Sequence, residues 1–244
     1  MAAALLQSVD FKLHERPAPG LLTAGVAALD SAFGGIPRGS VTDIFGPASS
    51  GRTSLARTLL AEATARGEFC ALVDASDAFD PASAAAAGVA LDRLLWIRCG
   101  GNVEHALKAT DLLLQAGGFG IVIMDLGDIA PVTARRISLA SWYRMRRAIE
   151  NTPTALVVTE QAPYARACAA LALECTRHKM TWLGAPGCSQ LLRGASFSTE
   201  RRKPLRPAGA VFEACALNSA PLRPRLPNHD REGVVAATFS QHPR

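Results

Sequence analysis

The sequence predicts a single α/β domain built on a mostly parallel, twisted sheet with helices on both faces. Short apolar segments alternate with helical stretches of about ten to fifteen residues, as in a parallel sheet that is buried on both sides. A glycine-rich turn, Gly46–Thr53, follows the first of these strands and opens the first long helix. At 244 residues the chain is long enough for one such domain with a sizeable core.

Strands and helices are expected in regular alternation from Val41 onward. The predicted strands are 41–45, 69–73, 94–97, 121–124 and 155–159, and the predicted helices are 55–66, 81–88, 103–115 and 134–150. After Gln161 a helical segment is expected over 165–170. Three further strand candidates, 171–176, 196–200 and 211–216, are separated by short turns and predict an antiparallel extension at the C-terminal side of the sheet.

The two ends of the chain differ in composition from this core. Residues 1–20 hold a short helix candidate, 2–13, and then a proline-rich linker, so we expect an N-terminal arm that could serve self-association. Residues 21–217 form the predicted core domain. Residues 218–244 are rich in proline and arginine with little periodicity, and we expect a mostly flexible tail.

The composition of the chain limits the classes of function and partner that we expect for it. The net charge of +5 permits an acidic partner such as DNA but does not require one. No window approaches the roughly 18 to 20 apolar residues of a membrane span, and the first residues lack a basic leader, so we expect a cytoplasmic protein with no membrane partner. The six cysteines form no C-x-x-C pair and the five histidines show no ligand spacing, which favours reduced structural cysteines over a zinc site.

One segment matches the phosphate-binding pattern G-x-x-x-x-G-K-[ST] at all but one position. Its glycines let the backbone fold around phosphates, and the following helix N-terminus offers N–H donors. Arg52 stands where the pattern has lysine, and a planar guanidinium does not replace the compact ammonium between the β- and γ-phosphates. We therefore expect ATP and Mg²⁺ to be held weakly and fast hydrolysis to be lost; a relic loop that binds no nucleotide is the alternative.

A carboxylate completes the predicted site. Asp125 ends the apolar strand 121–124, where it would lie beside the phosphate loop and help Thr53 to hold Mg²⁺. No residue is assigned a catalytic role. The candidate nucleotide-binding residues are Gly46, Ser49, Ser50, Gly51, Arg52, Thr53, Asp125 and Gln161.

These motifs belong to a longer series that resembles the RecA recombinase core. The matching segments, in family order, are Leu22–Asp30, Gly34–Gly39, Asp43–Thr53, Cys70–Pro81 and Val157–Gln161. The resemblance implies a RecA-like P-loop core. It also identifies two departures: Ser76 stands where the family has the glutamate that activates water, and Ser83 where a tyrosine stacks on adenine. Asp77 is an alternative carboxylate for the first role, although a one-residue shift at a strand end reverses the side-chain direction.

Other departures concern DNA. The two segments that correspond to the family's mobile DNA-binding loops look short, and we expect no C-terminal domain, so the resemblance does not predict RecA-type strand exchange. Within the superfamily, an eroded core of this length resembles ImuA, the RecA-like member of a bacterial translesion-synthesis assembly. SulA-like division inhibitors share the shrunken core, and this branch stays open.

The ImuA-like resemblance implies an accessory protein of DNA repair in the SOS response. Such an adaptor would act in mutagenic translesion DNA synthesis and bind a Y-family-like polymerase homologue, a RecA-type filament or a polymerase, and DNA. A slow DNA-stimulated regulatory ATPase is the alternative from the enzyme class. Two basic clusters are predicted to meet nucleic acid, and an ordinary solvated surface is the alternative for both. The candidate residues are Arg136, Tyr143, Arg144, Arg147, Arg201, Arg202 and Lys203.

Overall fold

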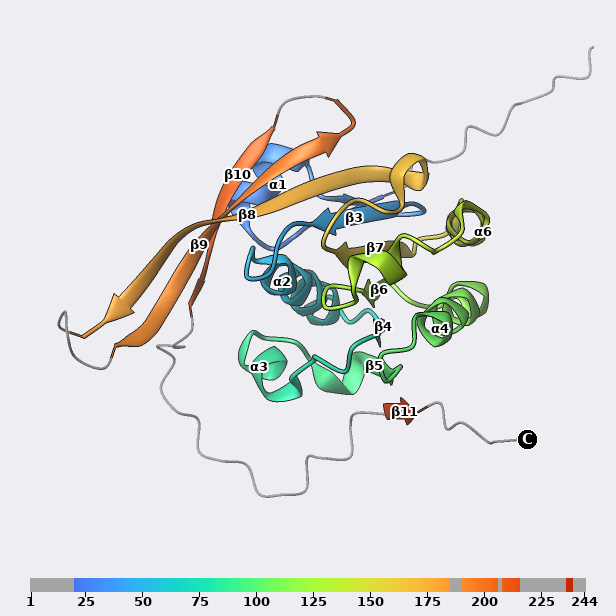
Figure 1. Cartoon of the computed structure of the whole chain (residues 1–244), viewed down its shortest axis with the longest axis horizontal. Coiled ribbons are helices and arrows are strands. Elements are labelled where there is room, and N and C mark those ends of the chain that lie inside the picture. The colour runs from blue at the N-terminus through green and yellow to red at the C-terminus, as the bar shows by residue number, and fades with distance from the viewer. Residues whose placement is uncertain (1–19, 185–189, 206–207, 216–235, 239–244) are drawn as a thin grey trace, which may run out of the picture.

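The computed structural model describes residues 20–184, 190–205, 208–215 and 236–238. In this part of the chain, nine strands form a sheet with the order β10-β9-β8-β3-β7-β6-β4-β5-β11, with helices on both faces (Figure 1). Strands β3 to β8 and β11 run parallel to one another, whereas β9 pairs antiparallel with both β8 and β10. The predicted fold class is confirmed.

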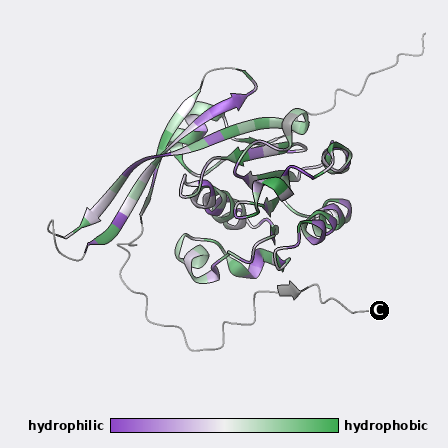
Figure 2. Ribbon diagram, viewed as in Figure 1, coloured by the Kyte–Doolittle hydropathy of each residue, from purple (hydrophilic) through white to green (hydrophobic). Residues whose placement is uncertain are grey.

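Five short parallel strands form the centre of the sheet. β3, β4 and β7 are buried along their whole length, in agreement with their largely apolar sequences. Figure 2 shows the hydrophobic residues concentrated in these central strands. The five strands are β3 (Val41–Phe45), β4 (Cys70–Asp74), β5 (Leu94–Arg98), β6 (Ile121–Asp125) and β7 (Ala155–Glu160).

Two groups of helices enclose two separate parts of the core. One cluster of buried residues joins α1 (Ala27–Phe33), α2 (Arg52–Ala65) and α3 (Pro81–Ala86) to the sheet. The other joins α4 (Val103–Ala116) and α6 (Leu139–Ile149) to the opposite face. A 3-10 turn, η1 (Leu91–Arg93), precedes β5. Polar caps start these helices: the carboxylate of Asp80 accepts two backbone N–H groups at α3, and the amide oxygen of Asn102 does the same at α4.

Two sequence predictions about helices are wrong. The expected helix 134–150 is divided into α5 (Pro131–Ala134) and α6, because Ser138 accepts the N–H of Ser141 at 3.1 Å and begins a new helix. Arg136 therefore lies in the intervening turn. The expected helix 165–170 is only a short 3-10 turn, η2 (Arg166–Cys168), after which the chain enters the next strand at Ala169.

The antiparallel extension is longer than the sequence pattern predicted. It consists of β8 (Ala169–Leu183), β9 (Leu191–Lys203) and β10 (Gly209–Cys215), and irregularities in the β8–β9 register obscure the two-residue alternation. A separate two-stranded sheet joins β1 (Leu21–Leu22) to β2 (Ile36–Pro37), where no strand was predicted. Within the predicted tail, β11 (Ala236–Thr238) pairs with β5. The rest of that tail and the predicted arm over 1–19 lie outside the described residues.

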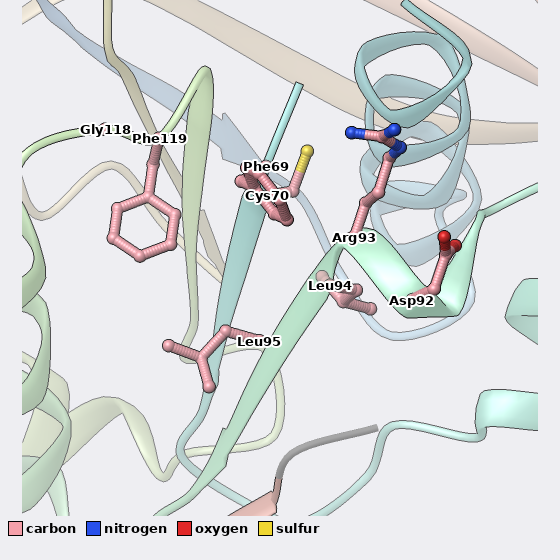
Figure 3. Close-up of a pocket in the computed structure, with 8 residues that line it drawn as sticks. All are labelled: Phe69, Cys70, Asp92, Arg93, Leu94, Leu95, Gly118 and Phe119. Carbon is pink, nitrogen blue, oxygen red and sulfur yellow. The ribbon is translucent and has the colours of Figure 1, made fainter. Parts of the chain in front are cut away.

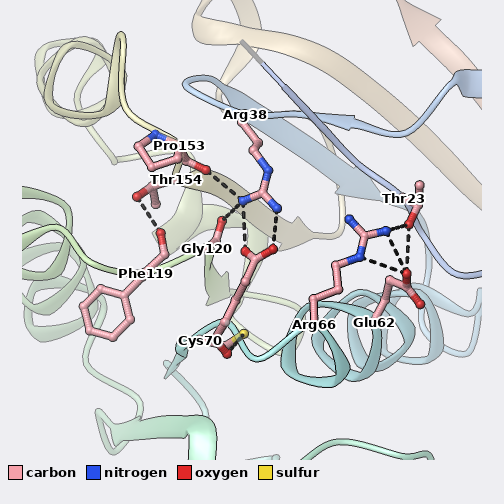
Figure 4. Close-up of polar contacts among 10 residues, drawn as sticks. Thr23, Arg38, Glu62, Arg66, Cys70, Phe119, Gly120, Pro153 and Thr154 are labelled. Carbon is pink, nitrogen blue, oxygen red and sulfur yellow. Dashed lines mark hydrogen bonds and ion pairs between the residues drawn. The ribbon is translucent and has the colours of Figure 1, made fainter.

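A half-buried ion pair fixes the edge at which the parallel strands begin. The Arg38 guanidinium donates to both oxygens of Glu68, at 2.7 and 3.0 Å, and to the carbonyls of Gly120 at 3.2 Å and Pro153 at 2.9 Å (Figure 4). A Cβ on Gly120 would lie 1.7 Å from a Glu68 oxygen, so only glycine fits there. The cluster ties together the starts of β3, β4, β6 and β7, and so holds their far ends in register.

Candidate nucleotide site

The predicted phosphate loop follows β3 and is folded tightly against the antiparallel extension. Gly51, at the start of α2, has φ +95°, and a Cβ there would lie 2.5 Å from the ring of Phe197 in β9. A Cβ on Gly46 would lie 2.2 Å from the carbonyl oxygen of Cys175 in β8. Ser49 is exposed with φ +59°, whereas Ser50 is buried and its hydroxyl has no hydrogen-bond partner among the described residues. Glycine is therefore required at both ends of the loop by close packing.

Arg52 is turned inward, away from solvent. Only 7% of this residue is exposed, and its Nη1 donates to the carbonyl of Gly127 at 3.3 Å. Gly127 belongs to the turn that follows β6, so the guanidinium links the first turn of α2 to the end of a neighbouring strand. The cation that the motif would aim at phosphates is thus engaged by a backbone carbonyl.

Asp125 and Gln161 meet at the same turn. Oδ1 of Asp125 accepts the Thr159 hydroxyl at 2.5 Å and the Gly127 N–H at 2.9 Å. Burial raises the pKa of Asp125, and these two hydrogen bonds oppose the rise. The Gln161 amide donates to the carbonyls of Gly127 at 3.1 Å and Ile129 at 3.2 Å. Arg52 and Gln161 therefore share one acceptor, Gly127, a residue that the sequence analysis did not single out although it stands two positions after Asp125.

Thr53 takes no part in this cluster. It is exposed on the first turn of α2, and within the described ranges no hydrogen bond joins it to Asp125. The structure thus brings Arg52, Asp125 and Gln161 together around Gly127 and leaves Thr53 at the surface. Its assignment as a magnesium ligand stays a prediction. No group of three or more metal-ligating side chains occurs in the part of the chain that the structure describes.

A pocket of about 620 Å³ lies beside the loop, between α2, α3, β9 and β10. Ser83 is part of its lining, as expected if the pocket receives a nucleotide base, but it supplies no ring. Two aromatic rings stand nearby: Phe197 and Phe212 line the pocket with centroids 5.4 Å apart. Nε of Arg57 is buried and has no hydrogen-bond partner among the described residues. The size and the unpaired donor fit a nucleoside.

The alternative carboxylate, Asp77, faces another part of the molecule. It has φ +62°, forms an ion pair with Arg98 at 3.1 Å and accepts the N–H of Gly100 at 3.3 Å. The preceding carboxylate, Asp74, accepts the N–H groups of Ala78 and Phe79 and the indole of Trp96, which shapes this loop. Because Asp77 is held at the β5 side, the proposal that it replaces the water-activating glutamate is not supported.

These observations test how well the site fits ATP and Mg²⁺. The loop backbone and the pocket fit a nucleotide, whereas the inward Arg52 does not reproduce a lysine between phosphates. When bound, ATP with Mg²⁺ would supply a γ-phosphoryl group that can pass to water as the phosphoanhydride bond to ADP breaks. The charges of Asp74 and Asp128 also raise the pKa of Asp125, so further carboxylates stand near this turn.

A pair of buried acids lies under the site and was not predicted. Asp43 in β3 and Glu160 in β7 are both fully buried, and their carboxyl groups are hydrogen-bonded to each other. Burial raises the pKa of Asp43 to about 7 and that of Glu160 to about 9, and in Glu160 the neighbouring charge of Asp43 adds to the rise. Glu160 also accepts the N–H of Tyr164 at 2.6 Å. At both Asp43 and Glu160, an acidic residue stands in a strand that is otherwise mostly apolar, and this pattern could have identified the pair from the sequence.

The first predicted basic cluster is exposed as expected. Trp142, Met145 and Ile149 face the core, whereas Tyr143, Arg144 and Arg147 of α6 face outward, and Arg136 is exposed in the preceding turn. Arg144 is partly neutralised by Asp111 of α4, at 3.1 Å.

The second predicted basic cluster has more contacts. Arg202 forms ion pairs with Glu174 at 2.5 Å and Glu200 at 3.1 Å, and the Arg201 guanidinium lies 5.9 Å from the Phe33 ring. Lys203 donates to the carbonyl of Ala167 at 3.0 Å. Burial raises the pKa of Cys168 in η2, and the charges of both Arg146 and Lys203 lower it. The two clusters therefore approach each other at η2. Arg146 was not among the predicted residues.

A second pocket, of about 380 Å³, lies where β4, β5 and β6 begin (Figure 3). Its lining includes Phe69, Leu95 and Phe119, and the guanidinium of Arg93 stands 5.5 Å from the Phe69 ring. This mainly apolar pocket is at the opposite edge of the sheet from the phosphate loop. Four cysteines in the described part of the chain are free and buried, as predicted: Cys70, Cys99, Cys168 and Cys175.

The sequence of this chain is similar to those of known proteins. Residues 13–136, about half of the chain, match the RecA N-terminal domain family. Protein RecA of Chloroflexus aurantiacus is 34% identical over 156 residues, which cover 57% of this chain and 44% of the relative. Protein RecA of Rickettsia canadensis is 43% identical over 118 residues, covering 47% of this chain and 34% of that protein. The chain thus spans less than half the length of these curated relatives.

A solved structure extends the likeness in fold. The RadB recombinase aligns with a TM-score of 0.58 at 18% identity, over 81% of this chain and 96% of that one. At this identity the alignment shows a shared fold. Among the helices in the described ranges, none combines the length and the apolar character that a membrane crossing requires.

Proposed function

Because this chain belongs to the RecA N-terminal domain family, we propose that it is a non-recombinogenic accessory protein of DNA repair. Its role would be that of an ImuA-like adaptor in SOS-induced mutagenic translesion DNA synthesis, with little or no ATP hydrolysis. A Y-family-like polymerase homologue, a RecA-type filament or a polymerase would be its protein partner, and DNA a further partner. It would act in the cytoplasm.

The position of Arg52 is the observation that carries this proposal. The side chain that should meet phosphates is buried and donates to the Gly127 carbonyl, which Gln161 also uses. If the Arg52 guanidinium turned toward a nucleotide, the buried carbonyl of Gly127 would lose one of its hydrogen-bond donors. A lysine ammonium acts as a compact point charge, whereas the Arg52 guanidinium is planar and already donates to the Gly127 carbonyl.

Two further features support loss of hydrolysis. Ser76 lacks a carboxylate that could activate water, and Asp77 next to it is paired with Arg98. Ser83 lines the base pocket without an aromatic ring. A RecA-type fold that keeps its loop and its buried sheet after such losses is suited to binding other molecules. Self-association through the N-terminal arm is part of the proposal, although the arm lies outside the described residues.

Calorimetry combined with phosphate release tests this function. The purified chain is titrated with ATP and Mg²⁺, with and without single-stranded DNA, and phosphate is followed in the same samples. We expect weak binding or none, and no phosphate release above that of Asp125→Ala. DNA-stimulated release that disappears in Asp125→Ala would overturn the adaptor role. Pull-down with a purified Y-family-like polymerase homologue then tests the partner, since an adaptor must retain it.

A slow, DNA-stimulated regulatory ATPase is the second candidate. The 620 Å³ pocket beside an intact glycine loop favours it, because a relic loop alone would not require a space of nucleoside size. The same titration decides between the two: turnover above the Asp125→Ala control selects the ATPase.

A further inference from the structure

The strand β5 is covered on its outer side over only part of its length. On its inner side, β4 pairs with all five of its residues, from Leu94 to Arg98. On its outer side, β11 pairs in parallel with the last three, beginning with Ala236 opposite Trp96 (Figure 1). Among the described strands, none pairs with Leu94 and Leu95 on this side. The outer side of β5 is therefore closed at the end of the strand and open at its start.

The sequence of β5 makes an open outer side unfavourable. Four of its five residues, Leu-Leu-Trp-Ile, are apolar, and its one charged residue, Arg98, is the last. Natural sheets protect an outermost strand with charged side chains, proline or a covering segment, because its free N–H and C=O groups pair readily with any extended chain. Where β5 is open it has neither charge nor proline, so a covering segment is the protection that remains.

The strand β11 is a weak cover for such a surface. It has three residues, Ala-Ala-Thr, and alanine is a poor strand former. About 20 residues separate it from β10, which is the outermost strand on the other side of the sheet. Closing so long a connection costs chain entropy, which three residue pairs offset only in small part. A longer extended segment should therefore displace β11.

The open part of β5 borders the second pocket, of about 380 Å³ (Figure 3). Leu94 and Leu95 belong to its lining, together with Phe69 before β4 and Phe119 before β6. Phe69 is 57% exposed, although phenylalanine is among the residues most often buried. A strand that runs parallel to β5 passes this pocket before it reaches Trp96. A segment that starts two residues earlier than β11 therefore brings a side chain to the pocket.

We propose that the open side of β5 and this pocket form a docking site for an extended segment of a partner protein, and that β11 is the chain's own displaceable cover of this site. The docked segment runs parallel to β5, pairs with it through the backbone and inserts a large apolar side chain into the pocket. The inference rests on the proposed function only in that the adaptor has a protein partner. It involves neither the phosphate loop nor the two basic clusters.

Fluorescence anisotropy tests the site with a labelled synthetic peptide of residues 231–244 of this chain, which contains the β11 sequence. The protein is the full chain, either unaltered or as Ala236→Pro/Ala237→Pro. Two adjacent prolines prevent β11 from pairing, because proline has no N–H to donate to the neighbouring strand. The proline variant should bind the peptide at least about tenfold more tightly, since it lacks an intramolecular competitor with an effective concentration on the order of millimolar.

A second form of the peptide tests the pocket. When the register of β11 is continued, position 235 of the peptide lies opposite Leu95, which lines the pocket. Val235→Phe in the peptide should therefore tighten binding about threefold or more, because the larger side chain buries more apolar surface. Phe69→Ala in the protein should abolish this gain. Leu139→Ala, which removes a similarly exposed apolar side chain from α6, should leave the gain intact.

Two results would overturn the docking site: a peptide that binds the unaltered chain and the proline variant equally or binds neither, and a gain from Val235→Phe that survives Phe69→Ala. Circular dichroism shows whether each variant is folded, and the Val235→Phe comparison is also made in the chain without prolines, so it does not depend on that variant. The assay contains no ATP, DNA or polymerase homologue. Its failure would leave the proposed function intact, and failure of the polymerase pull-down would leave the docking site intact.

Discussion

The two edges of the central sheet, where the parallel strands begin and where they end, differ in how fully their polar groups are hydrogen-bonded. Where the strands begin, Arg38 is 13% exposed at its side chain and has two carboxylate oxygens and two carbonyls as acceptors. Toward the other edge, the Ser50 hydroxyl and Arg57 Nε are buried without hydrogen-bond partners in the described residues. Buried polar groups without partners cost stability, and proteins keep them mainly where they serve a ligand or a change of state. The first edge therefore maintains the fold, and the second is where function is to be sought.

The largest change in the free energy of unfolding is expected at the edge where the strands begin, around Arg38. Arg38→Met removes four hydrogen bonds and leaves Glu68 part-buried without its cation, so the free energy of unfolding should fall by about 3 kcal/mol. Urea denaturation measures it. The matched control is Arg66→Met, which breaks the more exposed pair with Glu62 and should cost less than about 1 kcal/mol. Equal losses in the two variants would show that the first edge has no special role.

A smaller change in the free energy of unfolding, of opposite sign, is expected when one of the two buried acids is replaced. Because burial raises the pKa of Asp43 to about 7 and of Glu160 to about 9, the native state binds protons more tightly than the unfolded chain. Their contribution is fully present below the unfolded pKa near 4 and is lost as pH rises through about 7 to 9. Asp43→Asn should therefore raise the unfolding free energy at pH 8 by on the order of 2 kcal/mol and flatten this dependence.

The check is a series of urea denaturations between pH 5 and pH 9. Asp77→Asn, which alters an ion-paired acid nearer the surface, should retain the slope with pH. A slope as steep in Asp43→Asn as in the unaltered chain would mean that the buried pair is not its source.

Restoring the motif lysine sharpens the contrast at the phosphate loop. Arg52→Lys supplies a point charge that fits between phosphates, and we expect ATP with Mg²⁺ to bind about tenfold more tightly, equivalent to about 1.4 kcal/mol. Isothermal titration measures the change. Arg52→Ala also breaks the bond to the Gly127 carbonyl but adds no ammonium, and it should bring no gain. A similar gain in both variants would mean that Arg52 acts only by blocking the loop.

The smallest effect concerns the surface of α6. The Arg144 side chain, which pairs with Asp111, is 57% exposed. Arg144→Ala should therefore change the unfolding free energy by no more than about 0.5 kcal/mol. Thermal unfolding at two salt concentrations is sufficient to measure this. A loss above about 1 kcal/mol would give this surface a structural role that its exposure does not indicate.

Sequence reasoning reached the parallel sheet because its central strands are short, mostly buried and largely apolar. It found Arg52, Asp125 and Gln161, but not their common acceptor, Gly127, since a glycine in a turn carries no side chain to suggest a role. The restart of α6 at Ser138 was missed because the apolar spacing continues through the turn. The full length of β8 and β9 was missed for a different reason: the part of a strand that is exposed on both faces has no alternation to reveal it, and irregularities shift the β8–β9 register.

Phosphate release by the unaltered chain, compared with Arg52→Lys/Ser76→Glu in the presence of ATP, Mg²⁺ and single-stranded DNA, tests the central claim most directly. The claim is that a RecA-family core has lost hydrolysis through its own residues. It predicts no release above Asp125→Ala from the unaltered chain, and measurable release from the double variant. DNA-stimulated release from the unaltered chain that Asp125→Ala abolishes would contradict it and make the protein an ATPase.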